Sequence, residues 1–87
     1  MNTAITTAIQ LGALIREKRK SLKMTQRELA LAIDVGERFI VDLEKGKESC
    51  QLELSLRAAK AVGIRLMDEK TARKLPPSGG YDLSVLK

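Results

Sequence analysis

Most of the side chains that could do chemistry in this sequence are cations, and they are unevenly distributed. The chain has 87 residues and a formal net charge of +5 at pH 7. Residues 1–23 carry five Lys or Arg against one acid, residues 24–63 carry six against seven, and residues 64–87 carry five against three. Positive charge gathered in one region is typical of a surface that binds phosphate. The alternative is that these cations only solvate a helix. The N-terminal cations are Arg16, Lys18, Arg19, Lys20 and Lys23.

Side chains suited to catalysis or to metal binding are scarce. The sequence has no histidine and one cysteine, Cys50, which excludes an internal disulfide and leaves too few ligands for a structural zinc site. It shows no glycine-rich phosphate loop and no recognisable pair of catalytic carboxylates. A lone thiol at a predicted helix start is more often a small apolar filler than a nucleophile. We therefore expect no enzyme activity, no cofactor and no metal.

The same composition indicates where the chain works and in what form. One cysteine, the lack of a secretory signal pattern and an uncharged N-terminal stretch too short to span a bilayer indicate a cytoplasmic protein without membrane contact. A chain this short buries only about 60% of the surface that its unfolded form exposes. Small folds gain stability from disulfides, metals or oligomerisation. We therefore expect a homodimer.

Apolar spacing predicts four helices, and the first two begin at capping boxes. The pattern from Thr7 to Gln10 places the start of the first helix near Thr7, and its apolar run ends at residues 22–23. A second box joins Thr25 to Glu28 and opens a helix of about eight residues. This helix ends at residues 34–36, where Asp34 is one of the few non-glycine residue types that accept a left-handed conformation.

A third helix follows after only three or four residues, which is the geometry of a helix-turn-helix. Gly36 is an acceptable N-cap, and residues 45–47 close the helix with basic residues around a glycine. The side chains predicted to point inward from this helix are Phe39, Ile40 and Leu43. The fourth helix is predicted at residues 51–62, with Gly63 as its left-handed cap. Its predicted core face consists of Leu52, Leu56, Ala59 and Val62.

Beyond the fourth helix the helical pattern is lost. Residues 64–67 alternate briefly and predict a short strand. Residues 68–87 are predicted to be a flexible tail with a small apolar epitope. We therefore expect a DNA-binding and dimerisation domain at residues 1–67 and a tail at residues 68–87. The epitope consists of Tyr81, Leu83, Val85 and Leu86.

The segment from Thr25 to Gly46 resembles the lambda-repressor/Cro-like helix-turn-helix family. The resemblance rests on Thr25-Gln26-Arg27-Glu28-Leu29-Ala30, on the apolar Ile40, and on Leu43-Glu44-Lys45-Gly46, each at its usual spacing. It covers residues 9–67 and implies an all-α, four-helix fold. The layout is similar to HipB-type antitoxins, which are homodimers that repress their own operon and restrain a partner kinase toxin.

Two residues depart from the family pattern. Asp34 stands where the family usually has a glycine, and Gly36 stands where Ser or Thr commonly caps the recognition helix. The resemblance also implies that Glu44 braces the helix-turn-helix internally. The departures leave the fold intact, but they make the base specificity of relatives harder to transfer.

The motif implies how the chain would hold DNA. The third helix of such motifs lies in the major groove. There Arg38 would contact guanine, Glu37 would accept from cytosine N4, and Val41 would meet a thymine methyl. The alternative is that Glu37 and Arg38 are ordinary solvated charges. The full set of expected DNA-binding residues is Gln26, Arg27, Gly36, Glu37, Arg38, Val41, Lys45 and Lys47.

Phosphate contacts would come from the second helix and from the end of the third. Gln26 would bind phosphate through its amide and the free backbone N–H groups beside it, unless it is merely a solvent-facing first-turn residue. Arg27 is a second candidate for a phosphate or groove contact. Lys45 and Lys47 would clamp the DNA backbone.

Affinity would come from two copies on a palindromic operator, with half-sites about 34–36 Å apart or a multiple of one helical turn. The HipB resemblance implies that Ile64, Leu66 and Met67 pair as a two-stranded ribbon between subunits. The alternative is that these residues fold back on the first helix. The expected function is transcriptional repression, as the HipB-like antitoxin of a toxin–antitoxin operon that represses its own promoter and binds a HipA-like kinase toxin. The resemblance also implies a bacterial protein that lies at the nucleoid when it is bound to DNA. The alternative is a stand-alone phage-type or metabolic repressor.

Overall fold

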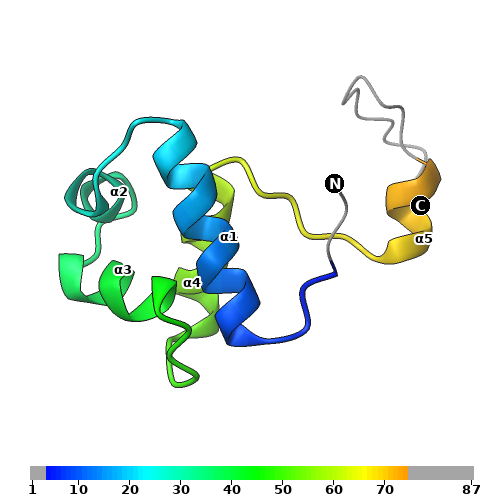
Figure 1. The fold of residues 1–87 in the computed structure, drawn as a ribbon, viewed down its shortest axis with the longest axis horizontal. Coiled ribbons are helices and arrows are strands. Elements are labelled where there is room, and N and C mark those ends of the chain that lie inside the picture. The colour runs from blue at the N-terminus through cyan, green and yellow to red at the C-terminus, as the bar shows by residue number, and fades with distance from the viewer. Residues whose placement is uncertain (1–3, 75–87) are drawn as a thin grey trace.

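The computed structural model describes residues 4–74, which are all-helical as predicted (Figure 1). No strand occurs among these residues, so the short strand predicted at residues 64–67 is absent. A strand needs a hydrogen-bonded neighbour, and the described part of the chain provides none. The elements are α1 (Ala8–Ser21), α2 (Gln26–Ala32), α3 (Glu37–Glu44), α4 (Leu52–Ala61) and α5 (Glu69–Lys74).

Both predicted capping boxes are confirmed. The Thr7 hydroxyl accepts from the Gln10 N–H at 3.1 Å, and the Gln10 side chain accepts from the Thr7 N–H at 3.1 Å. The Thr25 hydroxyl accepts from the Glu28 N–H at 3.0 Å, and the Glu28 carboxylate accepts from the Thr25 N–H at 2.7 Å. Each box satisfies two backbone donors that the helix itself leaves free. The starts of α1 and α2 are therefore fixed locally.

The turn between α2 and α3 is built as expected. Asp34 is left-handed with φ of 58°, and Gly36 is the N-cap of α3 without a side-chain hydrogen bond. Gly46 and Gly63 follow α3 and α4 with φ of 85° and 90°. Lys23 is also left-handed with φ of 57°, which the sequence pattern does not predict. This residue turns the chain between α1 and α2.

The core lies where α1, α2, α3 and α4 meet. Ile15, Leu29 and Ile40 are completely buried, one from each of the first three helices. Gly12 on α1 allows the closest approach, because an added Cβ would lie 2.3 Å from the backbone oxygen of Leu43 on α3. A side chain at this position would push the two helices apart. The contact with α1 thus supports α3 at its C-terminal end.

The predicted core face of α4 is partly wrong. Leu52 and Leu56 are 70% and 42% exposed, whereas Ser55 and Ala58 are buried. Ala59 and Val62 are buried as predicted. The helix is therefore rotated so that small side chains face the core. The prediction gave too much weight to the size of the two leucines.

A fifth helix lies within the segment predicted to be a tail. The Asp68 carboxylate accepts from the Thr71 N–H at 2.8 Å and from the Thr71 hydroxyl at 2.6 Å. These hydrogen bonds stabilise the carboxylate and lower the pKa of Asp68. The short helix α5 lies apart from the other four helices (Figure 1). The predicted epitope at residues 81–86 lies outside the described residues.

None of the helices in residues 4–74 is both long enough and apolar enough to cross a membrane.

Candidate nucleic-acid interface

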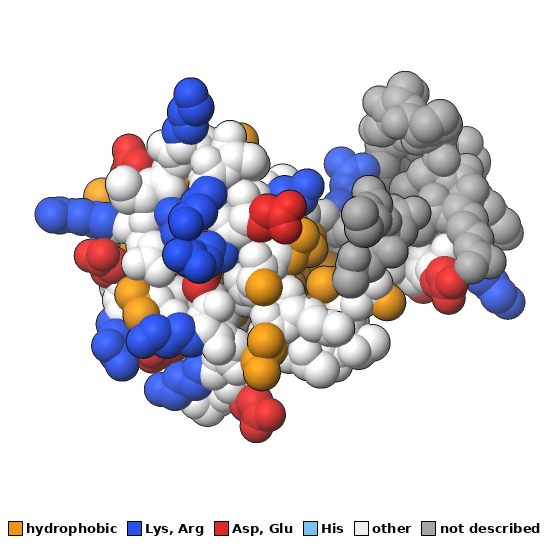
Figure 2. Space-filling model, in the orientation of Figure 1, with side chains coloured by type: hydrophobic (Ala, Val, Ile, Leu, Met, Phe, Trp, Pro, Cys, Tyr) orange, Lys and Arg blue, Asp and Glu red, His pale blue; other side chains and the backbone are white. Residues whose placement is uncertain are grey.

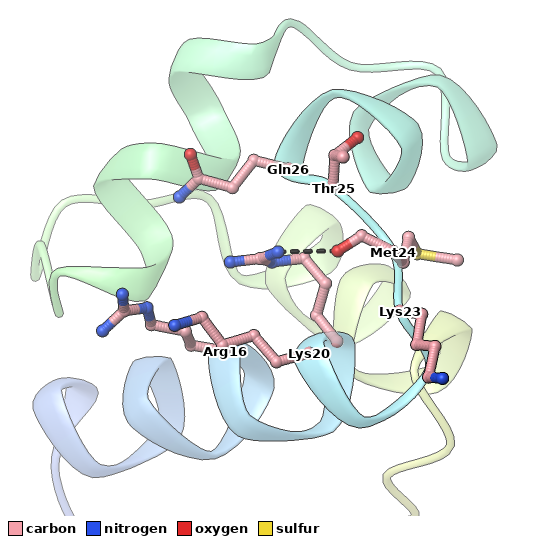
Figure 3. Close-up of a pocket in the computed structure, with 7 residues that line it drawn as sticks. Arg16, Lys20, Lys23, Met24, Thr25 and Gln26 are labelled. Atoms are coloured by element: carbon pink, nitrogen blue, oxygen red, sulfur yellow. Dashed lines mark hydrogen bonds between the residues drawn. The ribbon is translucent and has the colours of Figure 1, made fainter.

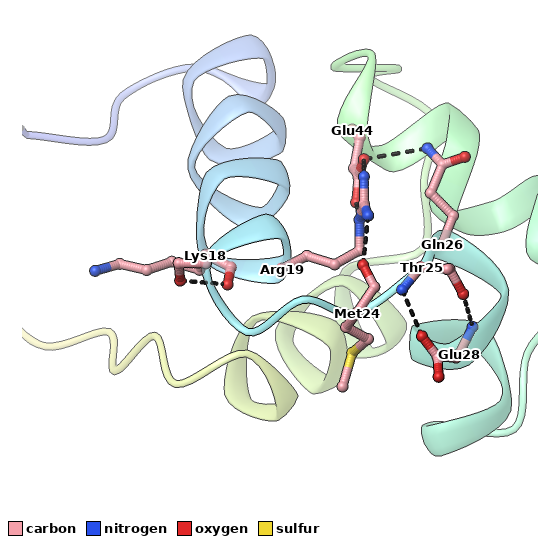
Figure 4. Close-up of polar contacts among 8 residues, drawn as sticks. Lys18, Arg19, Met24, Thr25, Gln26, Glu28 and Glu44 are labelled. Carbon is pink, nitrogen blue, oxygen red and sulfur yellow. Dashed lines mark hydrogen bonds and ion pairs between the residues drawn. The ribbon is translucent and has the colours of Figure 1, made fainter.

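A buried ion pair connects α1 to the end of α3 and to the start of α2. Arg19 and Glu44 have side chains that are only 8% and 3% exposed. The Arg19 Nε and Nη2 atoms donate to the two Glu44 carboxylate oxygens at 2.7 and 3.1 Å (Figure 4). Arg19 Nη1 donates to the backbone oxygen of Met24 at 2.7 Å. Such bidentate pairs fix orientation as well as distance.

The Arg19–Glu44 pair bears on one prediction for each of its two residues. Glu44 braces the helix-turn-helix internally, as the resemblance implied. Arg19 does not belong to the exposed cationic cluster, because its charge is matched by Glu44 inside the fold. Sequence reasoning grouped it with its basic neighbours on α1. The two partners are 25 residues apart, so no local pattern links them.

Gln26 begins α2 and also contacts Glu44. Its Nε2 atom donates to a Glu44 carboxylate oxygen at 3.1 Å, and the residue is half-buried (Figure 4). A glutamine amide nitrogen has two hydrogens and its oxygen accepts separately. One hydrogen is therefore committed to the fold. The contact attaches the start of α2 to the end of α3, so the two helices hold a fixed mutual position.

Three further cations surround this junction. An open groove of about 440 Å³ lies between the second half of α1 and the start of α2 (Figure 3). None of the side chains that line it within residues 4–74 is acidic. Arg16 and Lys20 extend on the side of α1 that faces Gln26 (Figure 3). The complete lining is Arg16, Arg19, Lys20, Lys23, Met24, Thr25 and Gln26.

The exposed face of α3 carries the residues predicted to meet base edges. Glu37 and Arg38 are exposed, and Val41 is half-buried. Gly36 is exposed, and an added Cβ there would meet nothing within 4 Å. Lys45 and Lys47 are exposed just beyond α3. The structure therefore brings the predicted residues of α3 and its flanks together in one region.

Arg27 is exposed on α2, beside the half-buried Gln26. Lys and Arg side chains gather on the part of the surface formed by α1, α2 and α3, with fewer acids between them (Figure 2).

An acid on α3 that sequence reasoning left without a role pairs with two of these cations. Asp42 Oδ1 lies 3.2 Å from Arg38 Nε, and Asp42 Oδ2 lies 3.5 Å from Lys47 Nζ. The Asp42 side chain is 17% exposed and that of Arg38 is 80% exposed. The first pair has the i,i+4 spacing of neighbours on a helix surface, which is a signal present in the sequence.

The three residues predicted for dimerisation differ in their burial. Ile64 is half-buried and packs against the core of its own chain. Leu66 and Met67 are 50% and 37% exposed. Only these last two offer apolar surface in the way that the predicted ribbon requires.

Cys50 lies partly buried against the core. Burial raises the pKa of its thiol, and the negative charge of Asp42 adds to this effect. A raised pKa lowers the fraction of reactive thiolate at neutral pH. The environment thus matches the predicted role of Cys50 as an apolar filler.

Comparison with known proteins gives a consistent family. A helix-turn-helix family model matches residues 15–68. An uncharacterised HTH-type transcriptional regulator of Sinorhizobium fredii is 43% identical over 66 residues, covering 76% of this chain and 87% of the relative. One from Methanothermobacter thermautotrophicus is 44% identical over 66 residues, covering 69% of this chain and 96% of the relative.

A phage protein and a solved structure extend the comparison. The ImmF control region 10 kDa protein of Bacillus phage phi105 is 32% identical over 74 residues, covering 84% of this chain and 82% of the relative. A variant HipB chain, solved in complex with an O2 20mer, superposes with a TM-score of 0.72 at 19% identity. The match covers 78% of this chain and 94% of HipB. The fold is therefore the one that HipB has.

Proposed function

The chain belongs to the helix-turn-helix family of transcriptional regulators, and we propose that it binds double-stranded DNA as a homodimer and represses transcription. The observation that carries this proposal is the fixed α2–α3 unit. Gln26 of α2 and Arg19 of α1 both bind Glu44 of α3, so this one carboxylate connects the three helices. The outer face of α3 is left free, with Glu37 and Arg38 exposed at its start. A rigid pair of helices with exposed polar side chains suits insertion into a major groove.

In the proposed docking, the start of α3 meets base edges. Arg38 would contact a guanine, Glu37 would accept from cytosine N4, and Val41 would pack against a thymine methyl. Gly36 has open space in place of a side chain, which allows the backbone to approach the duplex closely. Arg27 and the remaining polar atoms of Gln26 would contact phosphate beside the groove.

Phosphate contacts at the edges of the site would come from two sets of cations. Lys45 and Lys47 lie beyond the end of α3, and the groove cations Arg16, Lys20 and Lys23 lie beside the start of α2. Each cation that neutralises one phosphate makes the slope of log K against log salt more negative by about 0.9. We expect Lys20→Gln to weaken binding to all duplexes and to flatten that slope by about this amount. An unchanged slope would remove the groove from the interface.

Dimerisation is proposed through Leu66 and Met67 of each chain, with Ile64 anchoring the segment to its own core. Both side chains are exposed in the single chain and therefore have apolar surface to bury. A dimer would place two α3 helices on a palindrome with half-sites about 34–36 Å apart.

Two measurements test the repressor proposal. Sedimentation equilibrium should give a dimer, and Leu66→Asp should shift it to a monomer. Selection from a randomised duplex library should then yield palindromes with the wild-type protein. A monomeric wild type that selects no common sequence would refute the proposal. Circular dichroism of Leu66→Asp provides the control that the helices remain folded.

A second candidate function is that of a HipB-type antitoxin that restrains a HipA-like kinase toxin. It is supported by the fold that the chain shares with HipB over most of both chains. The likeness to the phage ImmF control region protein favours the alternative of a stand-alone phage-type repressor. Co-purification with a kinase encoded beside this gene would favour the antitoxin. If deletion of residues 76–87 leaves that capture unchanged, the tail takes no part in it.

A further inference from the structure

Asp42 is an acid that lies, like Glu37, on the DNA-binding side of α3 in the proposed docking. Its carboxylate has one cation at each oxygen, Arg38 Nε at 3.2 Å and Lys47 Nζ at 3.5 Å. The side chain is only 17% exposed, so it is held among its neighbours. The carboxylate therefore has a defined position on the helix surface, although its two partners are long and exposed.

A carboxylate at this place carries a cost. DNA presents a dense row of phosphates, and a negative charge near them opposes binding. Partial burial also penalises a charge that has no partner. A side chain that only filled space would serve as well without a charge. The presence of the charge points to a role in the arrangement of the two cations.

The geometry of the Arg38–Asp42 pair indicates what that role is. The guanidinium atom of Arg38 that lies 3.2 Å from the carboxylate is Nε, on one edge of the guanidinium plane. The guanidinium is a rigid fork, so attraction of its Nε edge toward the carboxylate also biases the direction of the two terminal nitrogens. The Arg38 side chain remains 80% exposed. Its terminal nitrogens are thus the ones presented outward, and a pair of N–H donors matches O6 and N7 of guanine.

We propose that Asp42 is a positioning residue for base recognition, which attracts the Nε edge of the Arg38 guanidinium so that both terminal nitrogens meet one guanine in each half-site. The Lys47 pair fixes the second carboxylate oxygen and keeps the acid in place. This inference rests on the proposed function, because it requires that Arg38 meets a base edge.

The proposal predicts two opposite effects of one substitution. Asp42→Asn keeps the shape of the side chain and removes its charge. We expect it to strengthen binding to an alternating dA-dT duplex, which offers Arg38 no guanine, about two- to fivefold, as the loss of one exposed charge interaction allows. We expect it also to weaken the preference for guanine at the Arg38 position by roughly threefold or more, because residues in contact are coupled. A role in folding alone would not produce this combination.

Glu48 provides a matched control. It is an exposed acid just beyond α3, close in sequence to Lys47. Glu48→Gln also removes one negative charge, and it lies ten residues from Arg38 along the chain. We expect Glu48→Gln to change affinity for all duplexes equally and to leave the guanine preference as it is. In an Arg38→Ala background, Asp42→Asn should likewise lose its effect on base preference.

The test uses the full chain with a randomised duplex library, followed by titration of the selected duplex and of single-base variants. The proposal stands if Asp42→Asn lowers guanine preference while Glu48→Gln does not. If Arg38→Ala abolishes the guanine preference and Asp42→Asn leaves it unchanged, the role of Asp42 is overturned while the proposed docking stands. It falls together with the proposed docking if Arg38→Ala itself has no effect on any selected base. Unfolding curves of the variants show whether a change arises from loss of fold.

Discussion

Two acids on α3, Glu44 and Asp42, each contact more than one partner side chain, but they differ in burial and in the elements from which their partners come. Glu44 is buried and binds Arg19 and Gln26 from two other helices. Asp42 lies two residues earlier and pairs with cations of α3 itself and of the turn that follows. Breaking a buried ion pair lowers the unfolding free energy by a large amount, whereas breaking an ion pair near the surface lowers it only slightly. The buried cluster fixes the fold, and the cluster of Asp42 with Arg38 and Lys47 at the surface is expected to add little to stability.

The largest effect is expected in the buried cluster. Glu44→Ala leaves the Arg19 guanidinium buried without its carboxylate, which costs about 3–5 kcal/mol of unfolding free energy. Urea denaturation at fixed protein concentration measures it. The double replacement Arg19→Met with Glu44→Leu is the control, because it removes both charges and is expected to lose much less. A loss below about 1 kcal/mol for Glu44→Ala would show that the two clusters are equivalent.

An intermediate effect is expected at the edge of the buried cluster. Gln26→Ala removes the hydrogen bond to Glu44 and frees the start of α2. Gln26 is half-buried, so we expect a loss of about 1.5 kcal/mol, at the low end for a bond to a charged group. In a Glu44→Ala background the same substitution should cost almost nothing. Equal losses in both backgrounds would mean that Gln26 acts through other contacts.

The smallest effect on stability is expected in the exposed cluster. Asp42→Asn should change the unfolding free energy by less than about 0.5 kcal/mol, because exposed pairs contribute little. Added salt should shrink even this difference, since exposed charges are screened. The loss in Glu44→Ala should persist in the same salt series. A loss of several kcal/mol for Asp42→Asn would place Asp42 in the scaffold, and the distinction between the clusters would fail.

Local features of the fold are the ones that the sequence predicted well. The capping boxes at Thr7 and Thr25 need only residues three positions apart, and both form. The left-handed Asp34 follows from the short connection between α2 and α3. Each of these is decided within a few residues, where local chemistry dominates.

Features that depend on distant partners were not predictable in this way. The Arg19–Glu44 pair joins residues on two helices, so Arg19 was grouped with exposed cations although it is buried. On α4 the small residues Ser55 and Ala58 face the core and Leu52 faces outward. Helical spacing alone allows either face, and only the close approach of α4 to the other helices selects the small one.

The candidate site was predictable in position and less so in arrangement. Resemblance placed Arg38 and Glu37 at the start of the third helix, and the structure exposes both there. The connection of Arg38 to Asp42 is visible as an i,i+4 spacing, but its meaning depends on how deeply Asp42 is buried. The sequence contains no direct measure of that burial.

The most direct test is the affinity of the purified chain for the palindrome selected from the randomised duplex library against a scrambled duplex of the same length and composition, at physiological salt. If the α2–α3 unit presents Arg38 to a major groove, the selected palindrome should be preferred by about 10³-fold or more. Equal affinities that fall together as salt rises would show that the chain binds phosphate alone. In that case α3 does not read DNA sequence.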